Sequence, residues 1–162
     1  MKWQIFVVGL FAGSCWASEV LATEFIGEMS ARDGDSLIFN GQDLALFGID
    51  AMEWNQICRD GNSDWACGDA SASALREKIA GKRVCCHQRN IDVYDRPEVV
   101  CFVGEEDLNA WLVRHGWALA LPVGRFNYAG EQAAAIEEGR GVWRGDFVPP
   151  WEWREGKRLN GN

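Results

Sequence analysis

The dipeptide Asn40-Gly41 constrains the fold of this 162-residue chain more than any other feature of its sequence. It lies between two short apolar runs, Leu37-Ile38-Phe39 and Leu44-Ala45-Leu46. Asn-Gly is the preferred sequence of a two-residue hairpin turn, because both residues adopt positive φ angles readily. The sequence therefore predicts two short strands paired about this turn within residues 37–46.

Strand signals precede helix signals along the rest of the chain. Further strands are expected over residues 24–31, 83–88 and 98–103. Helices are expected over 69–80, with Asp69 as N-cap, from Asp107 to Gly116, and over about 127–138. This order predicts a small α+β domain with a strongly curved or closed antiparallel sheet.

The N-terminus has the pattern of a secretory signal peptide. Lys2 is the only charge before Glu19, and the sixteen residues from Trp3 to Ser18 are uncharged. That run is too short to span a bilayer comfortably. We expect a signal peptide over residues 1–22 and one domain over 23–162, exported to the periplasm or secreted, with no membrane span in the mature chain.

The cleavage point of this peptide has alternatives. The small and branched residues Val20-Leu21-Ala22 favour cleavage after Ala22, and Ala17 is a second choice. Cys15 as a lipid-bearing cysteine is a less favoured alternative, because Ala12-Gly13-Ser14 lacks the usual leucine.

Export changes what the cysteines predict, because disulfides persist in oxidising compartments. Five of the six cysteines remain after residue 22, and none has the C-x-x-C spacing of a zinc or redox site. Cys58 and Cys67 bracket a loop rich in Gly, Asn, Ser and Asp, and we expect them to close it. Cys101 is expected to pair with Cys85 or Cys86 on the neighbouring strand, and alternation along a strand leaves that choice open; we favour Cys86.

The charge balance limits the partners of the domain. The net charge is −8, and loss of Lys2 and Glu19 with the signal peptide leaves it unchanged. Proteins that bind nucleic acid by neutralising phosphates usually present a basic face. Binding of nucleic acid is therefore expected to be weak.

Acidic side chains gather on both sides of the hairpin. Asp35 precedes it in Asp33-Gly34-Asp35-Ser36, and Asp50 and Glu53 follow it. Carboxylates together with a backbone carbonyl are typical ligands of calcium. Asp-Gly turns are also common in β-rich proteins without any metal, so this pattern alone favours ordinary turns. The same holds for the charged turn Asp92-Val93-Tyr94-Asp95-Arg96.

Six motifs follow one another along the chain: DGDS, GIDAMEWNQIC, CG-x-x-A, Asp92-x-Tyr94-x-Arg96, DLNAWLVRHGWALA and GVWRGDFVPPWEWR. Taken together, they resemble the staphylococcal-nuclease-like (thermonuclease) family in its exported bacterial branch. They cover nearly the whole of residues 23–162. The resemblance implies an OB-fold barrel of five strands with about three helices, and calcium-dependent hydrolysis of phosphodiester bonds in DNA or RNA.

The resemblance also implies roles for single residues. Asp35 and Asp50 match the carboxylates that hold calcium, and the carbonyl of Ala51 matches the backbone ligand. Glu53 matches the carboxylate that orients or deprotonates the attacking water, and Arg96 matches the arginine that binds the scissile phosphate. Cation and guanidinium would offset the charge that builds on the phosphoryl oxygens.

Departures from the family pattern weaken the catalytic hypothesis. Ala45 stands where the family has a second phosphate-binding arginine, and Arg32 is the only cation close in sequence. Hairpin pairing about Asn40-Gly41 would place Ala45 opposite Ser36, next to Asp35. Met52 replaces a proline before Glu53, and Asp95 replaces a glycine beside Arg96. Pro97 stiffens the backbone at the position that follows Arg96.

Two hypotheses follow. One is an exported calcium-dependent nuclease. The other, which we favour, is a partly degenerate nuclease-fold protein with an accessory role in biosynthesis of the exopolysaccharide succinoglycan, partnered by exopolysaccharide machinery, as the exported branch implies. A glycosidase using Asp35, Asp50 or Glu53 has little support beyond the presence of carboxylates.

Tryptophans offer further candidates for binding. Four lie in segments expected to be loops or tails, where indole rings can stack on bases or sugars: Trp54, Trp65, Trp151 and Trp153. Trp111, Trp117 and Trp143 are expected in the core, and a tail packed on the body explains Trp151 and Trp153 equally well.

Overall fold

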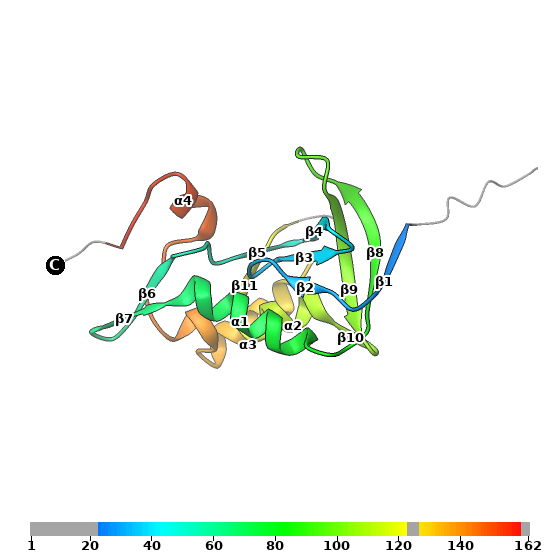
Figure 1. Ribbon diagram of the computed structural model, residues 1–162. Coiled ribbons are helices and arrows are strands. Elements are labelled where there is room, and N and C mark those ends of the chain that lie inside the picture. Colours follow the sequence, from blue (N-terminus) through cyan, green and yellow to red (C-terminus); the bar gives the residue numbers. More distant parts are fainter. Residues whose placement is uncertain (1–22, 123–126, 160–162) are drawn as a thin grey trace, which may run out of the picture.

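A computed structural model of the chain describes residues 23–122 and 127–159 (Figure 1). The expected signal peptide lies outside the described residues. The main sheet has the strand order β1-β8-β9-β4-β3-β2, with β10 added beside β9. Its strands are β1 (Glu24–Gly27), β2 (Ser30–Ala31), β3 (Ser36–Phe39), β4 (Gln42–Leu46), β8 (Val84–Ile91), β9 (Pro97–Val103) and β10 (Glu106–Asp107).

The two edges of this sheet come from one short stretch of chain. β1 pairs with β8 at one edge, and β2, only three residues further on, pairs with β3 at the other. Such a connection requires the sheet to curl, and the result is the half-barrel of an OB-like α+β fold, as expected. The single strand predicted over residues 24–31 was wrong, because the chain changes its partner strand at residues 28–29.

The hairpin predicted about Asn40-Gly41 is confirmed. Its two turn residues have φ angles of 50° and 83°, which suit Asn and Gly. β3 and β4 are antiparallel, and Ser36 lies opposite Ala45. A wholly antiparallel sheet was wrong in one place: β4 runs parallel to β9, with Ala45 beside Glu98.

Four α-helices lie within the described residues. They are α1 (Cys67–Ile79), α2 (Leu108–Arg114), α3 (Ala129–Glu137) and α4 (Pro150–Arg154), and a 3₁₀ turn, η1 (Gly141–Arg144), precedes α4. The first three correspond to the expected helices. The side chain of Asp107 caps α2 by accepting a hydrogen bond of 2.9 Å from the N–H of Ala110.

The start of α1 differs from the prediction. The helix begins at Cys67 rather than at Asp69, and Ala66 at its N-cap makes no side-chain capping bond. The N–H of Gly68 instead donates to the carbonyl oxygen of Gln56, at 3.2 Å. A contact from another part of the chain therefore satisfies a donor that Asp69 was expected to cap.

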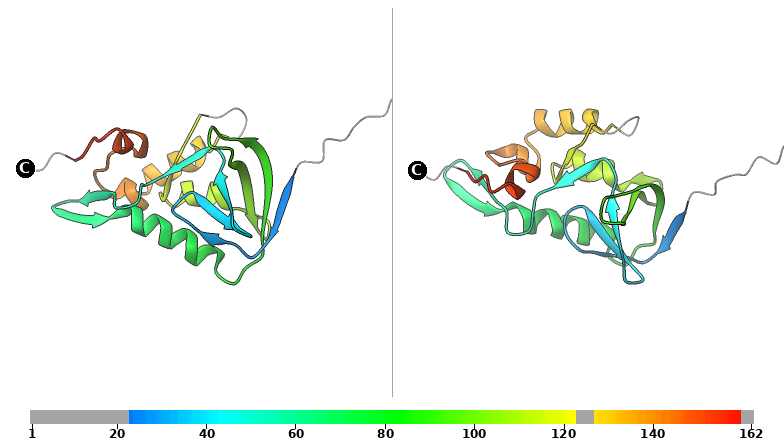
Figure 2. Two further views of the ribbon diagram at one scale, coloured as in Figure 1. Left: turned by 45° about the horizontal axis from the view of Figure 1, so that its top comes forward. Right: turned by 90° about the horizontal axis from the view of Figure 1, so that it is seen from above.

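The segment before α1 is a β-hairpin, not the expected loop. β6 (Ile57–Asp60) pairs with β7 (Ser63–Ala66) about a turn at residues 61–62, where Gly61 has a φ of 58°. A disulfide joins Cys58 to Cys67. This hairpin and α4 lie together at the end of the molecule away from β1 (Figures 1 and 2).

The second disulfide joins Cys86 to Cys101, and Cys85 is free. Cys86 and Cys101 are directly opposite each other on β8 and β9. Cys86 shares the buried face of β8 with Val84, whereas Cys85 points to the other face, with its sulfur 3.7 Å from Nε2 of His87. Cys86, and not Cys85, pairs with Cys101 because its side chain lies on the buried face of β8.

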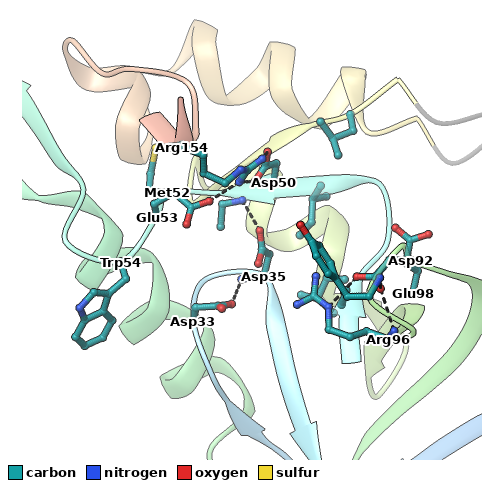
Figure 3. Close-up of a pocket in the computed structure, with 16 residues that line it drawn as sticks. Asp33, Asp35, Asp50, Met52, Glu53, Trp54, Asp92, Arg96, Glu98 and Arg154 are labelled. Carbon is teal, nitrogen blue, oxygen red and sulfur yellow. Dashed lines mark hydrogen bonds and ion pairs between the residues drawn. The ribbon is translucent and has the colours of Figure 1, made fainter. Parts of the chain in front are cut away.

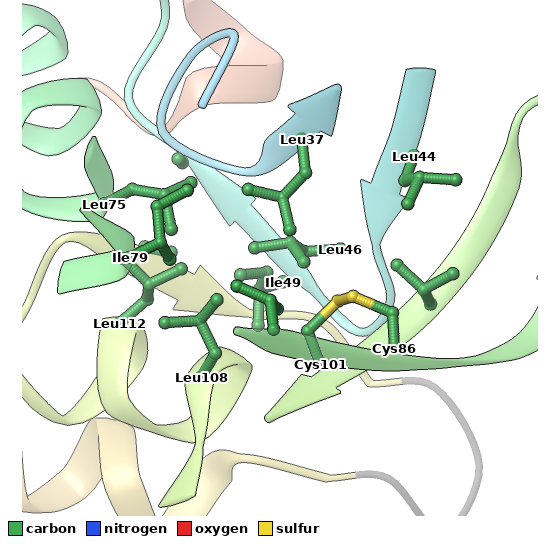
Figure 4. Packing of buried hydrophobic residues seen from close by; sticks show 14 of the residues in the cluster. Leu37, Leu44, Leu46, Ile49, Leu75, Ile79, Cys86, Cys101, Leu108 and Leu112 are labelled. Atoms are coloured by element: carbon green, nitrogen blue, oxygen red, sulfur yellow. A yellow bond between two sulfur atoms is a disulfide. The ribbon is translucent and has the colours of Figure 1, made fainter. Parts of the chain in front are cut away.

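The core fills the concave side of the sheet. It is built largely of aliphatic side chains from the strands and from α1 and α2, and it includes the Cys86–Cys101 bridge (Figure 4). Within it, the buried side chain of Asn109 accepts from the N–H of Cys101 and donates to the carbonyls of Phe47 and Val99. Asn109 therefore fixes α2 to the parallel pair β4–β9, whose ends carry the candidate site.

Among the described residues, none of the helices has the length and apolar character that crossing a bilayer requires.

Candidate functional site

A pocket of about 490 Å³ opens at one end of the half-barrel (Figure 3). Its walls come from the turn before β3, from β4, from β5 (Ile49–Ala51) and the residues after it, from the β8–β9 turn, and from α4. Every site residue expected from the sequence lines it: Asp35, Ala45, Asp50, Ala51, Glu53 and Arg96. Residues separated by up to 61 positions in the sequence are therefore brought to one place.

Asp35 links the turn before β3 to β5. Its Oδ2 atom accepts a hydrogen bond of 2.7 Å from the N–H of Ala51. Burial raises the pKa of the Asp35 carboxyl to about 8, and the nearby charges of Asp33 and Asp50 add to the increase. The site thus holds a carboxyl group whose charged form is disfavoured by burial and by its acidic neighbours.

Asp50 and Glu53 lie on and just after β5, which pairs with β11 (Ala118–Ala120). The side chain of Asp50 is only 10 % exposed, and that of Glu53 is 32 % exposed. The N–H of Glu53 donates to Oε1 of the fully buried Gln56, at 2.9 Å. Gln56 also donates through Nε2 to the carbonyl of Val148, at 2.6 Å, so it joins the Glu53 turn to the C-terminal segment.

Arg96 lies at the opposite wall, directly before β9. Its Nε atom donates to Oδ2 of Asp92 at 2.7 Å, and its guanidinium lies 5.7 Å from the ring centre of Tyr94. The backbone N–H groups of Tyr94 and Arg96 both donate to Oδ1 of Asp92. Arg96 is therefore held in the turn by Asp92 and keeps other N–H donors for a ligand.

Asp95, in the same turn, adopts the left-handed conformation, with a φ of 60°. This is the conformation in which glycine is favoured, and glycine is the residue that the family resemblance implies at this position.

Arg154, from α4, is the functional candidate that the sequence analysis missed. Its NH1 and NH2 atoms donate to Oδ1 and Oδ2 of Asp50 at 3.0 and 2.8 Å, and NH1 also bonds to Oε1 of Glu53 (Figure 3). The hydrogen bonds with Asp50 raise the pKa of Arg154. The motif GVWRGDFVPPWEWR ends in this residue, but local patterns do not show that it reaches β5.

Arg32 does not fill the place of the arginine absent at Ala45. It pairs with Asp43. The strand register instead sets Glu98 beside Ala45, and both residues line the pocket. The position where the resemblance implies a phosphate-binding cation therefore has a carboxylate as its neighbour.

The tryptophans divide between the two roles considered for them. Trp54 is 64 % exposed at the rim of the pocket. Trp65 lies in β7, packs beside the smaller core cluster and carries the guanidinium of Arg144 3.9 Å above its ring. Trp65 therefore lies in a strand and not in the expected loop, and Arg144 occupies one face of its ring. Trp111, Trp117 and Trp143 pack against the core, as expected.

The oxygen atoms of the pocket are of the kind that a hard cation binds, but they are fewer than such a cation takes. Asp35, Asp50 and the carbonyl of Ala51 are the oxygen ligands that the resemblance implies, and calcium takes six to eight. Among the described residues there is no cluster of three Asp, Glu, His or Cys side chains that could hold a metal by themselves. Water or ligand oxygens would have to complete the shell.

Comparison with known proteins gives one informative similarity. No protein-family model matches the chain. Over 127 residues it is 35% identical to succinoglycan biosynthesis protein ExoI of Rhizobium meliloti (strain 1021). The aligned region covers 76% of this chain and 66% of ExoI, just under two thirds of that protein's length. The chain is thus similar over most of its length to a protein of succinoglycan biosynthesis.

Proposed function

We propose that this protein is an exported accessory protein of exopolysaccharide biosynthesis, acting on or beside a polymer of the succinoglycan type. The observation that carries the proposal is the similarity to ExoI over 127 residues. Two disulfides in a small domain suit a protein that works outside the cytoplasm.

The charges of the pocket support an accessory role over efficient phosphodiester hydrolysis. The arginine expected at Ala45 is absent, Glu98 lies beside that position, and Arg154 is engaged by Asp50 and Glu53. A phosphodiester entering the pocket would meet several carboxylates and few available cations, and like charges in one site repel.

The test is deletion of the gene in the organism that carries it. We expect the amount or chain length of the exopolysaccharide to change, and the wild-type gene to restore it. Complementation with Asp50→Asn/Glu53→Gln tests whether the pocket is needed to restore the polymer. Complementation with Lys157→Gln, a substitution outside the pocket, is the matched control. An unchanged polymer in the deletion strain would contradict the proposal.

A second candidate is a calcium-dependent phosphodiesterase. It is favoured by the convergence of Asp35, Asp50, Glu53 and Arg96 in one pocket. Asp35, Asp50 and the carbonyl of Ala51 would hold the calcium ion, which would supply Lewis-acid stabilisation of the phosphoryl oxygens. Glu53 would take the proton of the attacking water, and the free N–H groups of Arg96 would bind the phosphate.

Digestion of denatured DNA with and without calcium tests this candidate. Cleavage by the wild-type protein that Glu53→Gln abolishes would support it. No cleavage by the wild-type protein and no calcium binding would remove it, while leaving the accessory role open.

A further inference from the structure

We infer that Arg154 is a built-in counter-cation that competes with a divalent cation for Asp50, so that α4 acts as a latch over the pocket. The inference rests on the cation site of the second candidate function. It concerns the C-terminal segment of the chain and not the chemistry of hydrolysis.

Arg154 engages Asp50 through a pair of hydrogen bonds. Arg154 meets both carboxylate oxygens of Asp50, at 3.0 and 2.8 Å, and contacts Glu53 through the same NH1 atom. Paired guanidinium–carboxylate bonds are strong and directional. Both oxygens of a carboxylate proposed as a cation ligand are thus already engaged by a side chain.

The helix that carries Arg154 is short and is attached to the protein by few buried groups. α4 has only five residues, and Pro150 is the one of them that is buried. α4 contacts β5, the strand that carries Asp50. The side chain of Arg154 is itself 50 % exposed, so water can replace the partners that it would lose on release. Within the described residues, the side-chain hydrogen bonds that join α4 to earlier parts of the chain are those of Arg154, so its last turn, beyond the buried Pro150, can detach at lower cost than a core helix.

The pocket beside Arg154 is acidic. Asp33, Asp35, Asp50 and Glu53 line the pocket together, and Arg154 is the cation that contacts two of them. A divalent ion between Asp35 and Asp50 would lie close to the guanidinium and repel it. Cation binding and the latch contact therefore oppose each other, and each weakens the other by the same factor.

Calorimetric titration of the purified full chain with calcium tests the inference directly. We expect Arg154→Gln to bind calcium about tenfold more tightly than the wild-type protein, since loss of about 1.4 kcal/mol of competition changes affinity tenfold. Arg154→Lys keeps the charge without the paired bonds and should lie between them. Lys157→Gln, which removes an ion pair with Glu152 in the same segment, should match the wild-type affinity.

Amide hydrogen exchange provides a second readout that is independent of activity. The N–H groups of Trp153, Glu155 and Gly156 are bonded within the α4 segment. Calcium should accelerate their exchange in the wild-type protein, because it releases α4. In Arg154→Gln their exchange should already be fast without calcium.

The outcomes separate the latch from the cation site. Calcium binding that Arg154→Gln leaves unchanged or weakens would overturn the latch and keep the cation site. If that variant also bound a single-stranded oligonucleotide less tightly in EDTA, Arg154 would be a phosphate-binding arginine instead. Absence of calcium binding in both proteins would overturn the latch and the cation site, while the accessory role would still be judged by the polymer.

Discussion

Ala45 and Glu98 are paired residues on the parallel strands β4 and β9, and both face the pocket. An arginine introduced at position 45 would therefore have Glu98 as an ion-pair partner beside it. Glu98 would draw the guanidinium away from a bound phosphate. The effect of an arginine at position 45 therefore depends on the charge of Glu98.

We accordingly predict that Ala45→Arg alone restores less phosphodiesterase activity than Ala45→Arg/Glu98→Gln. A transition-state arginine is worth on the order of 10³-fold in rate, and the double variant should recover the larger part of that factor. The measurement is calcium-dependent digestion of denatured DNA. Glu98→Gln alone is the control and should gain little, and equal rates for the single and double variants would contradict the role given to Glu98.

Asp95 adopts a φ of 60°, which costs a non-glycine residue about 1–2 kcal/mol, less for Asp than for most residues. We predict that Asp95→Gly raises the free energy of unfolding by up to about 1 kcal/mol. Thermal unfolding checks this. Asp95→Ala is the matched control: it removes the charge but keeps the strained conformation, so it should be no more stable than the wild-type protein.

Asp35 is a carboxyl group whose pKa burial and its acidic neighbours raise to about 8. Asparagine would keep an acceptor for the N–H of Ala51 without the charge. We predict that Asp35→Asn has a higher melting temperature than the wild-type protein in EDTA. Calcium should stabilise the wild-type protein by about 2.7 kcal/mol at a hundred times its dissociation constant, and should not stabilise the variant. A calcium-dependent rise in both proteins would exclude Asp35 as a ligand.

Gln56 is fully buried, and it bonds to the N–H of Glu53 and the carbonyl of Val148. Gln56→Ala would leave both groups without this partner and open a cavity. We predict a loss of about 2–4 kcal/mol in the free energy of unfolding, measured with urea. Gln42→Ala, at an exposed strand end, should change it by less than about 0.5 kcal/mol. A small effect at Gln56 would mean that water replaces its bonds.

Asp107 caps α2, and burial raises the pKa of its carboxyl. In the pH range just above 3.8, the unfolded carboxyl is ionised while the folded one keeps its proton, so stability falls as pH rises through this range. We predict that Asp107→Asn, which keeps the cap, flattens this fall and is more stable at pH 7. Asp107→Ala should lose about 1 kcal/mol with the cap. Unfolding curves across the acidic range measure both effects.

Local chemistry determined the elements that could be predicted from the sequence. The turn at Asn40-Gly41 and the cap at Asp107 each depend on residues within a few positions of one another. The start of α1 could not be predicted, because the carbonyl of Gln56 satisfies the N–H of Gly68. Sequence patterns indicate the secondary structure that a segment favours by itself, and they do not indicate which distant group forms hydrogen bonds with its ends.

The candidate site shows the same division. Asp35, Asp50, Glu53 and Arg96 were identified through motifs, and the structure brings them to one pocket. Arg154 was missed, since it lies 104 positions from Asp50 and its contact depends on the path of the chain after η1. The parallel pairing that brings Glu98 to Ala45 has no local signal either.

The neighbours Cys85 and Cys86 make oxidative folding of this protein sensitive to an error of one residue. A bridge from Cys85 to Cys101 would pull β8 one position along β9. Because side chains alternate along a strand, such a slip would turn Val84 outward and His87 into the core. A disulfide isomerase acting on this protein would thus correct the register of β8 against β9 as well as the wrong disulfide.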